Sequence, residues 1–222
     1  MIFDNDGVLV DSEPLANRIL ADLLTAAGVP TTYEEALRDY MGGSVSRVHH
    51  LVRDRTGVVL PDDFDDEYHR RLFEVFRTDL RPVRGGSELM DLLDAAGMPY
   101  CVASSGTHER IRVALDRVGL LSRFGDDRIF SSQDVDRGKP APDLFLHAAS
   151  RMGAEPARTV VIEDSGTGVQ AALAAGMTVY GYAAMTPAER LAGAHALVTN
   201  LADLAPMLLD GQRHPRRAED SR

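Results

Sequence analysis

From residue 86 onward, short apolar runs alternate with amphipathic segments of helical periodicity, which is the pattern of repeated strand–helix–strand units. Such units fold into a parallel sheet with helices on both faces. Several predicted helices are followed by glycine, as helix ends commonly are. The predicted strands lie at residues 99–104, 128–130, 159–163, 178–182 and 196–198, and the predicted helices at 86–96, 107–118, 142–151, 167–175 and 201–209.

The first part of the chain has a different pattern. One short strand at residues 1–4 is followed by helical periodicity without an alternating strand, and four helices are expected at residues 14–27, 33–40, 44–56 and 62–79. The sequence therefore predicts an α/β fold in which a doubly wound, Rossmann-like parallel sheet carries an inserted four-helix domain. We expect the core to comprise residues 1–12 and 83–210. The helical domain, with its hinge segments, is expected at residues 13–82, and a disordered polar tail at residues 211–222.

Composition and charge exclude several classes of protein. The 44% hydrophobic and 26% charged content is ordinary for a globular chain, and no apolar run approaches the roughly 20 residues that span a bilayer. A formal charge of −10 opposes binding to nucleic acid or an anionic membrane. Aspartates among the first seven residues are incompatible with a signal peptide. We expect a cytoplasmic monomer whose partner is a small molecule.

Acidic side chains follow two of the predicted strands. Asp4 and Asp6 follow the first strand, and Glu163 and Asp164 follow the apolar run Val160–Ile162. The carboxyl ends of parallel strands meet at one edge of the sheet, so up to four carboxylates gather there and need a cation. Oxygen ligands favour Mg²⁺. By itself, the first pair is equally typical of a polar strand end with an Asp-Gly turn.

Two further segments have the chemistry of a phosphate site. Ser104, Ser105 and Gly106 join a strand to a helix, whose N-terminal N–H groups attract anions, although an ordinary helix N-cap has the same sequence. Lys139 is the only lysine among 24 basic residues and lies in the loop Arg137–Asp143. Because every other basic residue is an arginine, the lysine suggests that this position needs a compact ammonium group. In a fixed loop, such a group would bind a phosphate.

These four segments, in this order, resemble the haloacid dehalogenase superfamily of phosphohydrolases. Asp4 to Gly7 is similar to its nucleophile loop, Ser104 to its hydroxyl motif, Lys139 to its lysine motif, and Glu163-Asp164 to its metal motif. The helical insertion resembles the cap domain of this superfamily, and residues 8–13 resemble its β-phosphoglucomutase-like subgroup. The resemblance covers the chain to about residue 209.

The resemblance implies phosphoryl transfer through a covalent aspartyl phosphate. Asp4 would be the nucleophile and Asp6 the general acid and base. Asp4, the backbone carbonyl of Asp6, and Asp164 would hold Mg²⁺. Glu163 would be a further ligand, or it would accept hydrogen bonds from groups that surround the ligands.

The resemblance also implies how phosphate and substrate are held. Lys139 and Ser104, with the backbone N–H groups of Ser105 and Gly106, would bind the transferring phosphoryl oxygens. Arg47, approached through Gly43, matches a cap segment that contacts the end of the substrate away from the phosphorus. An exposed helix arginine is an equally good interpretation of Arg47.

The leading hypothesis is a Mg²⁺-dependent phosphatase of small metabolites, most plausibly a sugar or sugar-acid phosphate. One alternative is a β-phosphoglucomutase, which the resemblance disfavours because Ala16 stands where that enzyme has a histidine and Ser12 where it has a threonine. A phosphoacceptor regulatory domain also uses clustered acids, a hydroxyl and a lysine, but it has no inserted helical domain. An inactive binding protein is a further alternative, although all catalytic positions are filled.

Overall fold

The computed structural model describes residues 1–41 and 45–213. In this part of the chain, six strands form one sheet in the order β3-β2-β1-β4-β5-β6, and every neighbouring pair is parallel. The predicted doubly wound α/β fold is thereby confirmed. The strands are β1 (Ile2–Phe3), β2 (Cys101–Ser104), β3 (Ile129–Ser131), β4 (Val160–Glu163), β5 (Thr178–Tyr182) and β6 (Ala196–Val198).

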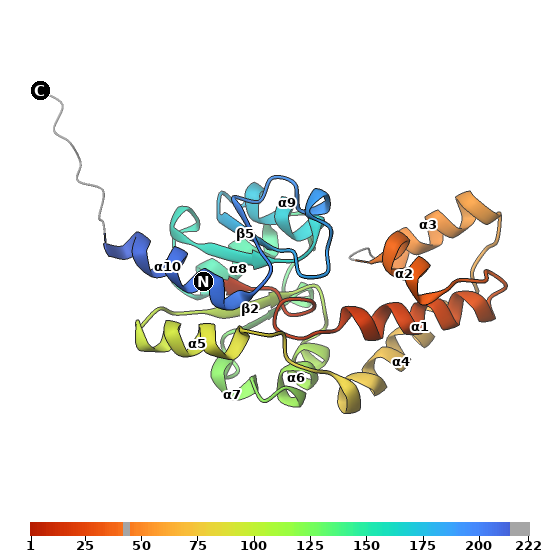
Figure 1. The fold of residues 1–222 in the computed structure, drawn as a ribbon, viewed down its shortest axis with the longest axis horizontal. Coiled ribbons are helices and arrows are strands. Elements are labelled where there is room, and N and C mark those ends of the chain that lie inside the picture. Colours follow the sequence, from red (N-terminus) through yellow and green to blue (C-terminus); the bar gives the residue numbers. More distant parts are fainter. Residues whose placement is uncertain (42–44, 214–222) are drawn as a thin grey trace, which may run out of the picture.

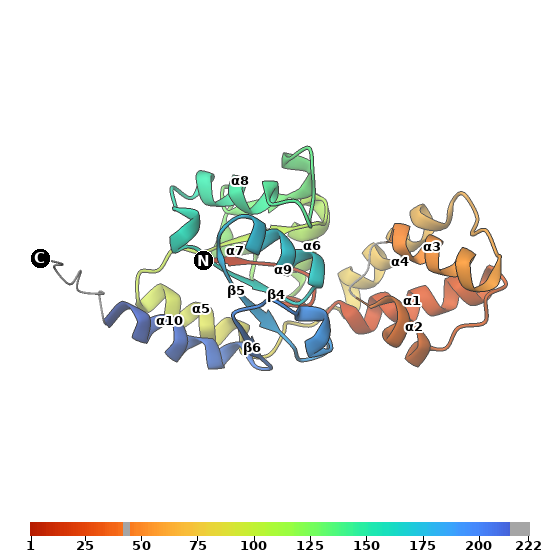
Figure 2. The same ribbon diagram turned by 90° about the horizontal axis from the view of Figure 1, so that it is seen from above.

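Helices cover both faces of this sheet (Figures 1 and 2). Successive strand residues point to opposite faces, so Phe3 packs with α5, α6 and α10, whereas Ile2 packs with α8 and α9. Both faces are therefore apolar, and the strands are buried along nearly their whole length. The helices are α5 (Gly86–Ala95), α6 (His108–Arg117), α8 (Asp143–Arg151), α9 (Gly166–Ala174) and α10 (Leu204–Arg213).

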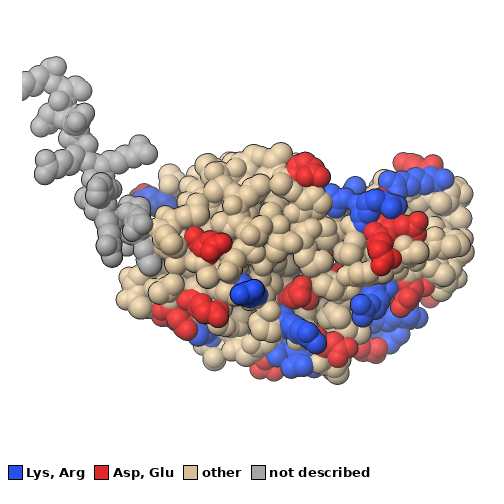
Figure 3. All heavy atoms as spheres, viewed as in Figure 1, with Lys and Arg blue, Asp and Glu red and all other residues tan. Residues whose placement is uncertain are grey.

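Four helices lie between β1 and β2 in the chain and form a separate group beside the sheet (Figures 1 and 2). Their apolar sides pack on one another, with Leu24, Val52, Leu72 and Phe76 almost completely buried. On the face drawn in Figure 3, acidic and basic side chains are intermixed over these helices. They are α1 (Glu13–Ala26), α2 (Tyr33–Tyr40), α3 (Val45–Thr56) and α4 (Phe64–Asp79).

The helical group is connected to the core by two chain segments that run side by side. The N–H of Asp11 donates to the carbonyl of Arg81 (2.9 Å), and the N–H of Val83 donates to the carbonyl of Leu9 (3.0 Å). A side-chain contact adds to these backbone bonds, because the guanidinium of Arg190 in the core donates to the backbone carbonyl of Met41 at 2.9 Å. Helix α4 also packs against α6 of the core.

Some short elements were not expected from the sequence. Helix α7 (Leu121–Phe124) is a single turn, too short to show a periodic pattern. Helix α10 continues to Arg213, so residues 211–213 are helical rather than part of a disordered tail, because no proline interrupts the backbone there. Residues 214–222 lie outside the described part. The 3₁₀ helices are Ser132–Asp134, Pro156–Arg158, Ala188–Leu191 and Leu201–Asp203.

No helix in the described ranges combines the length and the apolar character needed to cross a bilayer.

Candidate active site

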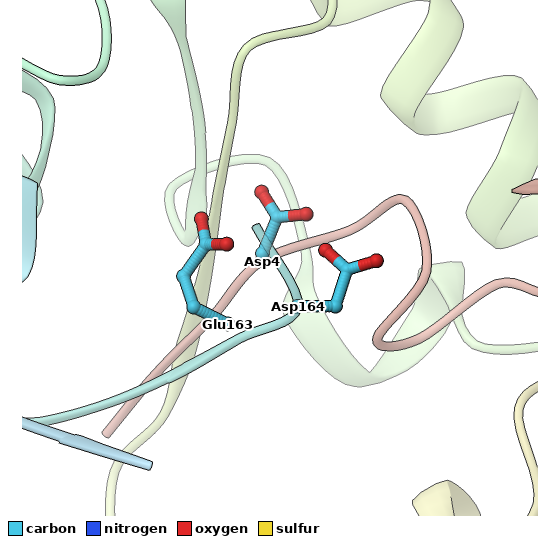
Figure 4. A group of neighbouring side chains, drawn as sticks. All are labelled: Asp4, Glu163 and Asp164. Carbon is cyan, nitrogen blue, oxygen red and sulfur yellow. The ribbon is translucent and has the colours of Figure 1, made fainter. Parts of the chain in front are cut away.

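The predicted acidic residues meet at the carboxyl edge of the sheet. Strands β1 and β4 are parallel neighbours with Phe3 paired to Ile162, so Asp4 and Glu163 follow at equivalent positions. Asp4, Glu163 and Asp164 are buried, and one oxygen of each lies within 4.8 Å of the other two. Figure 4 shows the three carboxylates on the same side of their strands. These three residues are called the acidic cluster below.

The only lysine of the chain lies against this acidic cluster. Nζ of Lys139 is 2.6 Å from Oδ1 of Asp4 and 2.5 Å from Oε1 of Glu163, and it donates to the carbonyl of Ala103 at 3.1 Å. Its side chain is 3% exposed. Three acceptors match the three N–H donors of an ammonium group. A planar guanidinium has a different donor geometry, which explains the single lysine in an arginine-rich chain.

The second oxygen of Glu163 is also bound by the protein. Oε2 accepts hydrogen bonds from the backbone N–H (3.0 Å) and the hydroxyl (2.9 Å) of Ser165. The carboxylate passes directly over Gly168, where a Cβ atom would lie 1.8 Å from Cδ of Glu163. Glycine at 168 therefore makes room for this carboxylate at the start of α9, and Glu163 is fixed beside Lys139.

Asp164 depends on a second glycine in the same way. Gly7 has a φ of +77°, which disfavours any side chain, and a Cβ atom there would lie 1.9 Å from Oδ2 of Asp164. The Asp-Gly sequence after β1 is therefore more than a turn signal, because the glycine lets the loop pass close to the carboxylate of the neighbouring strand.

Burial and mutual repulsion change the acidity of the acidic cluster. Burial is the largest cause that raises the pKa of Asp4 to about 7; Lys139 opposes this rise, and the charges of Glu163 and Asp6 contribute to it. Burial, followed by the charges of Glu13, Glu163 and Asp4, raises the pKa of Asp164 well above its ordinary value. One ammonium does not offset this much negative charge, so the cluster favours a further cation.

The serine-rich turn is well ordered by hydrogen bonds. Ser104 ends β2 and is buried, and its Oγ accepts from the N–H of Gly106 at 3.1 Å. Ser105 is exposed, and its carbonyl accepts from Ser132. The N-cap of α6 is Thr107, whose side chain accepts from the N–H of Arg110. Ser104 and Ser105 are therefore not the helix cap, which was the alternative interpretation of this segment.

Asp6 lies apart from the acidic cluster and has its own cation. Nη2 of Arg110 is 3.0 Å from Oδ1 of Asp6, and both side chains are about one-fifth exposed. Burial lowers the pKa of Arg110, but Asp6, Tyr68 and Asp4 outweigh it and the net shift is upward. Arg110 could not be recognised from the sequence, because nothing in the local sequence distinguishes it from the other arginines on α6.

The residues predicted to contact the rest of the substrate are not all brought to the site. Arg47 is exposed on α3, and its Nη1 donates to the backbone carbonyl of Asp39 at 3.3 Å. Gly43 lies outside the described residues.

One cavity adjoins the site, a second lies within the helical group, and Glu13 lines both. The larger, about 240 Å³, adjoins the acidic cluster through Asp164 and reaches Pro82 in the segment that joins the helical group to the core. The smaller, about 50 Å³, lies among α1, α2, α3 and α4, and its lining includes Glu13, Asn17 and Tyr68. Arg47 lines neither cavity.

Comparisons with known proteins show which family this chain belongs to. The family model described as haloacid dehalogenase-like hydrolase matches residues 1–176. The 6-phosphogluconate phosphatase of Escherichia coli is 29% identical over 185 residues (83% of this chain, 82% of the relative), and hexitol phosphatase A of the same organism is 29% identical over 191 residues (86% and 85%). A conserved haloacid dehalogenase-like protein from Agrobacterium tumefaciens superimposes with a TM-score of 0.86 at 34% identity, covering 96% of this chain and 98% of that one. The chain therefore belongs to the haloacid dehalogenase-like hydrolase family and is a phosphoric monoester hydrolase.

Proposed function

We propose that the protein is a Mg²⁺-dependent phosphatase that hydrolyses a phosphorylated sugar or sugar acid through an aspartyl-phosphate intermediate on Asp4. The observation that carries this proposal is the contact between Asp4 and Lys139 beside two further buried carboxylates. A carboxylate held against a buried ammonium at the carboxyl edge of a parallel sheet is in position to receive a phosphoryl group.

Phosphoryl transfer occurs in two steps. An oxygen of the Asp4 carboxylate attacks phosphorus, the bond between phosphorus and the ester oxygen breaks, and the protonated Asp6 gives its proton to the departing alkoxide. In the second step, the Asp6 carboxylate takes a proton from a water molecule whose oxygen attacks the phosphorus of the aspartyl phosphate. This step releases inorganic phosphate and restores the carboxylate of Asp4.

The donors around Asp4 are assigned to the phosphoryl oxygens. Lys139 neutralises their charge, and Ser104 donates its hydroxyl hydrogen, which the bond that its Oγ accepts from the N–H of Gly106 leaves available. The backbone N–H groups of the Ser105-Gly106 turn add further donors.

The acidic cluster fits Mg²⁺ in its donor atoms and its charge. All three side chains offer carboxylate oxygens, the chemistry that this ion prefers, and their burial leaves Asp4 and Asp164 with raised pKa values that a cation would lower. Asp4, Asp164 and the backbone carbonyl of Asp6 would hold the ion. When bound, Mg²⁺ neutralises the cluster, so that an anionic ester can approach an anionic nucleophile. Both oxygens of Glu163 already have protein partners, so we assign it mainly to holding Lys139.

The substrate class rests on relatives and on the helical insertion. Two relatives are named for 6-phosphogluconate and hexitol phosphates, which are polyhydroxylated chains. We assign residues 13–82 as a cap over the core site. Its cavity is lined by a carboxylate (Glu13), an amide (Asn17) and a phenol (Tyr68), which can exchange hydrogen bonds with hydroxyl groups. Arg47 is assigned to a polar or anionic end of the substrate.

A phosphate-release screen tests the proposal. The purified protein is assayed with Mg²⁺ against sugar phosphates, sugar-acid phosphates, polyol phosphates and nucleotides, and initial rates are compared. We expect the highest kcat/KM among the first three groups and no release in excess chelator. Highest activity on nucleotides would contradict the substrate class, and full turnover in chelator would contradict the metal requirement.

A further inference from the structure

Arg110 occupies a position between three parts of the proposed site. It is the third residue of α6, which begins directly after the serine-rich turn. Its Cδ lies 3.6 Å from the place that a Cβ atom would take at Gly106, so its side chain passes beside this turn. Its guanidinium then reaches Asp6, with Nη2 3.0 Å from Oδ1. The side chain is therefore adjacent to the turn assigned to phosphate and to the residue assigned to proton transfer.

The same guanidinium contacts the helical cap. Cζ of Arg110 lies 5.2 Å from the ring centroid of Phe76, which is fully buried on α4. The guanidinium thus lies between a core carboxylate and an aromatic ring of the cap, an arrangement that stabilises a cation on both sides. Movement of α4 relative to α6 would change the surroundings of Arg110 and, through it, those of Asp6.

Asp6 needs such a partner because of its neighbours. It is two residues from Asp4 and precedes Gly7, whose φ of +77° belongs to a turn rather than to the strand. The acidic cluster consists of Asp4, Glu163 and Asp164, and Asp6 is not part of it. The guanidinium of Arg110 holds the Asp6 carboxylate away from that cluster. Asp6 is then free to reach the ester oxygen and does not become a further ligand of the metal ion.

We propose that Arg110 is a positioning residue that holds the carboxyl group of Asp6 toward the leaving group, and that Phe76 couples this position to the packing of the cap. The proposal rests on the proposed role of Asp6 as general acid. Arg110 acts through Asp6, so its loss should matter most for substrates whose leaving group must be protonated. A guanidinium that bound the transferring phosphate instead would affect all esters alike.

The test compares kcat/KM for two substrates. This parameter covers only the steps up to departure of the leaving group, so hydrolysis of the aspartyl phosphate, which also uses Asp6, does not enter. For the best alkyl phosphate from the screen, Arg110→Ala should lower kcat/KM by about 100-fold, the lower end of general acid catalysis. For 4-nitrophenyl phosphate, whose phenolate departs without a proton, the loss should stay below about 5-fold. Equal losses would overturn the proposal in favour of phosphate binding.

A double-mutant cycle tests whether Arg110 acts through Asp6. With Asp6→Ala as background, Arg110→Ala should cause less than about a 3-fold further loss on the alkyl phosphate, because there is no carboxyl group left to position. A further loss as large as in the wild-type background would contradict the proposal. Arg110→Lys should restore part of the alkyl phosphate activity, since it retains the charge.

Two control variants separate positioning from folding. Arg112, two residues along α6, pairs with Asp126 on the surface, and Arg112→Ala should leave the ratio of the two kcat/KM values at the wild-type level. Phe76→Leu keeps an apolar side chain but removes the ring, and it should shift the ratio in the same direction as Arg110→Ala by a smaller factor. A wild-type ratio in a folded Phe76→Leu protein would refute the coupling to the cap.

Failure of the proposed function would be recognised separately. If the wild-type protein hydrolyses no ester in the screen, the function is wrong, and if Asp6→Ala keeps full alkyl phosphate activity, the role of Asp6 is wrong. If the wild-type protein is active and Asp6→Ala is impaired, the function and the role of Asp6 stand, and equal losses of Arg110→Ala on the two substrates then refute the proposal for Arg110 alone.

Discussion

Nζ of Lys139 lies 2.6 Å from Oδ1 of Asp4, although the two residues are 135 positions apart in the chain. The contact forms because β1 and the loop before α8 meet at the same edge of the sheet. It places the proposed nucleophile next to a buried cation that also contacts Glu163. The same ammonium can therefore stabilise the free carboxylate and, after transfer, the phosphoryl oxygens on it.

Replacement of Lys139 tests this contact. Lys139→Arg should lower kcat by at least about 100-fold, because a planar guanidinium cannot replace an ammonium among three acceptors in a space where the side chain is 3% exposed. Lys139→Ala leaves two buried carboxylates without their cation and should lower the free energy of unfolding by about 3–5 kcal/mol. Urea titrations and steady-state kinetics measure these effects.

The matched control lies in the same loop. Arg137 is exposed and pairs with Asp143, so Arg137→Ala should change kcat by less than about 2-fold and stability by less than about 1 kcal/mol. Near wild-type kcat in Lys139→Arg would show that any cation suffices at this position.

The raised pKa of Asp4 predicts how the metal-free protein responds to pH. Between its ordinary value of 3.8 and the folded value of about 7, the folded state binds more protons than the unfolded state, so stability decreases as pH rises through this window. Mg²⁺ favours the ionised carboxylates and should oppose this loss. The rise in Tm on adding Mg²⁺ should therefore be at least about 3 °C larger at about pH 8 than at about pH 5.

Thermal unfolding in chelator and in Mg²⁺ measures this difference. Asp164→Asn, which removes one charge of the acidic cluster, should reduce both the pH dependence and the response to Mg²⁺. Equal Tm increases at the two pH values would argue against a metal bound by these carboxylates.

The identity of residue 16 predicts hydrolysis rather than isomerisation. Ala16 lines the smaller cavity on α1 and offers no group that could return a proton to a bound sugar. Given β-glucose 1-phosphate and a bisphosphate primer, the protein should release inorganic phosphate at least about 10-fold faster than it forms glucose 6-phosphate. A coupled assay for glucose 6-phosphate, run beside a phosphate assay, decides this, and predominant isomer formation would make the enzyme a mutase.

Arg47 tests the contribution of the cap to specificity. If its guanidinium binds the far end of the substrate, Arg47→Ala should lower kcat/KM for the best metabolite by about 10-fold to 100-fold, and for 4-nitrophenyl phosphate by less than about 3-fold. Arg53, on the same helix and also exposed, is the control. Equal losses on both substrates would assign Arg47 to the fold, and no loss would leave it a solvated helix arginine.

Residues at strand ends were the most predictable part of the site. The positions of Asp4, Glu163 and Asp164 follow from the apolar runs before them, because parallel strands of similar register end together. Lys139 was recognised because it is the only lysine of the chain. The alternation of apolar runs and helices in the second half likewise predicted the sheet and its longer helices, because buried parallel strands appear as apolar runs and the longer helices show their period.

Contacts between elements could not be predicted. Arg110 is one of several arginines on amphipathic helices, and its pairing with Asp6 depends on how α6 packs against both the first loop and α4. The contacts of both Glu163 oxygens, one with Lys139 and one with Ser165, depend on the close approach of Gly168 to this carboxylate. That approach follows from the packing of α9 on the sheet. Both are tertiary features without a local sequence pattern.

The most direct test of the central claim is detection of a phosphoryl group on Asp4. The wild-type protein is mixed with excess 4-nitrophenyl phosphate and Mg²⁺, quenched in acid within one turnover, and digested for mass spectrometry, with Asp4→Asn treated in parallel. We predict a phosphorylated peptide whose modification maps to Asp4 in the wild type, and in Asp4→Asn no such peptide and a rate of phosphate release at least about 1000-fold lower. A phosphoryl group on another residue, or substantial phosphate release by folded Asp4→Asn, would contradict the assignment of Asp4 as the nucleophile.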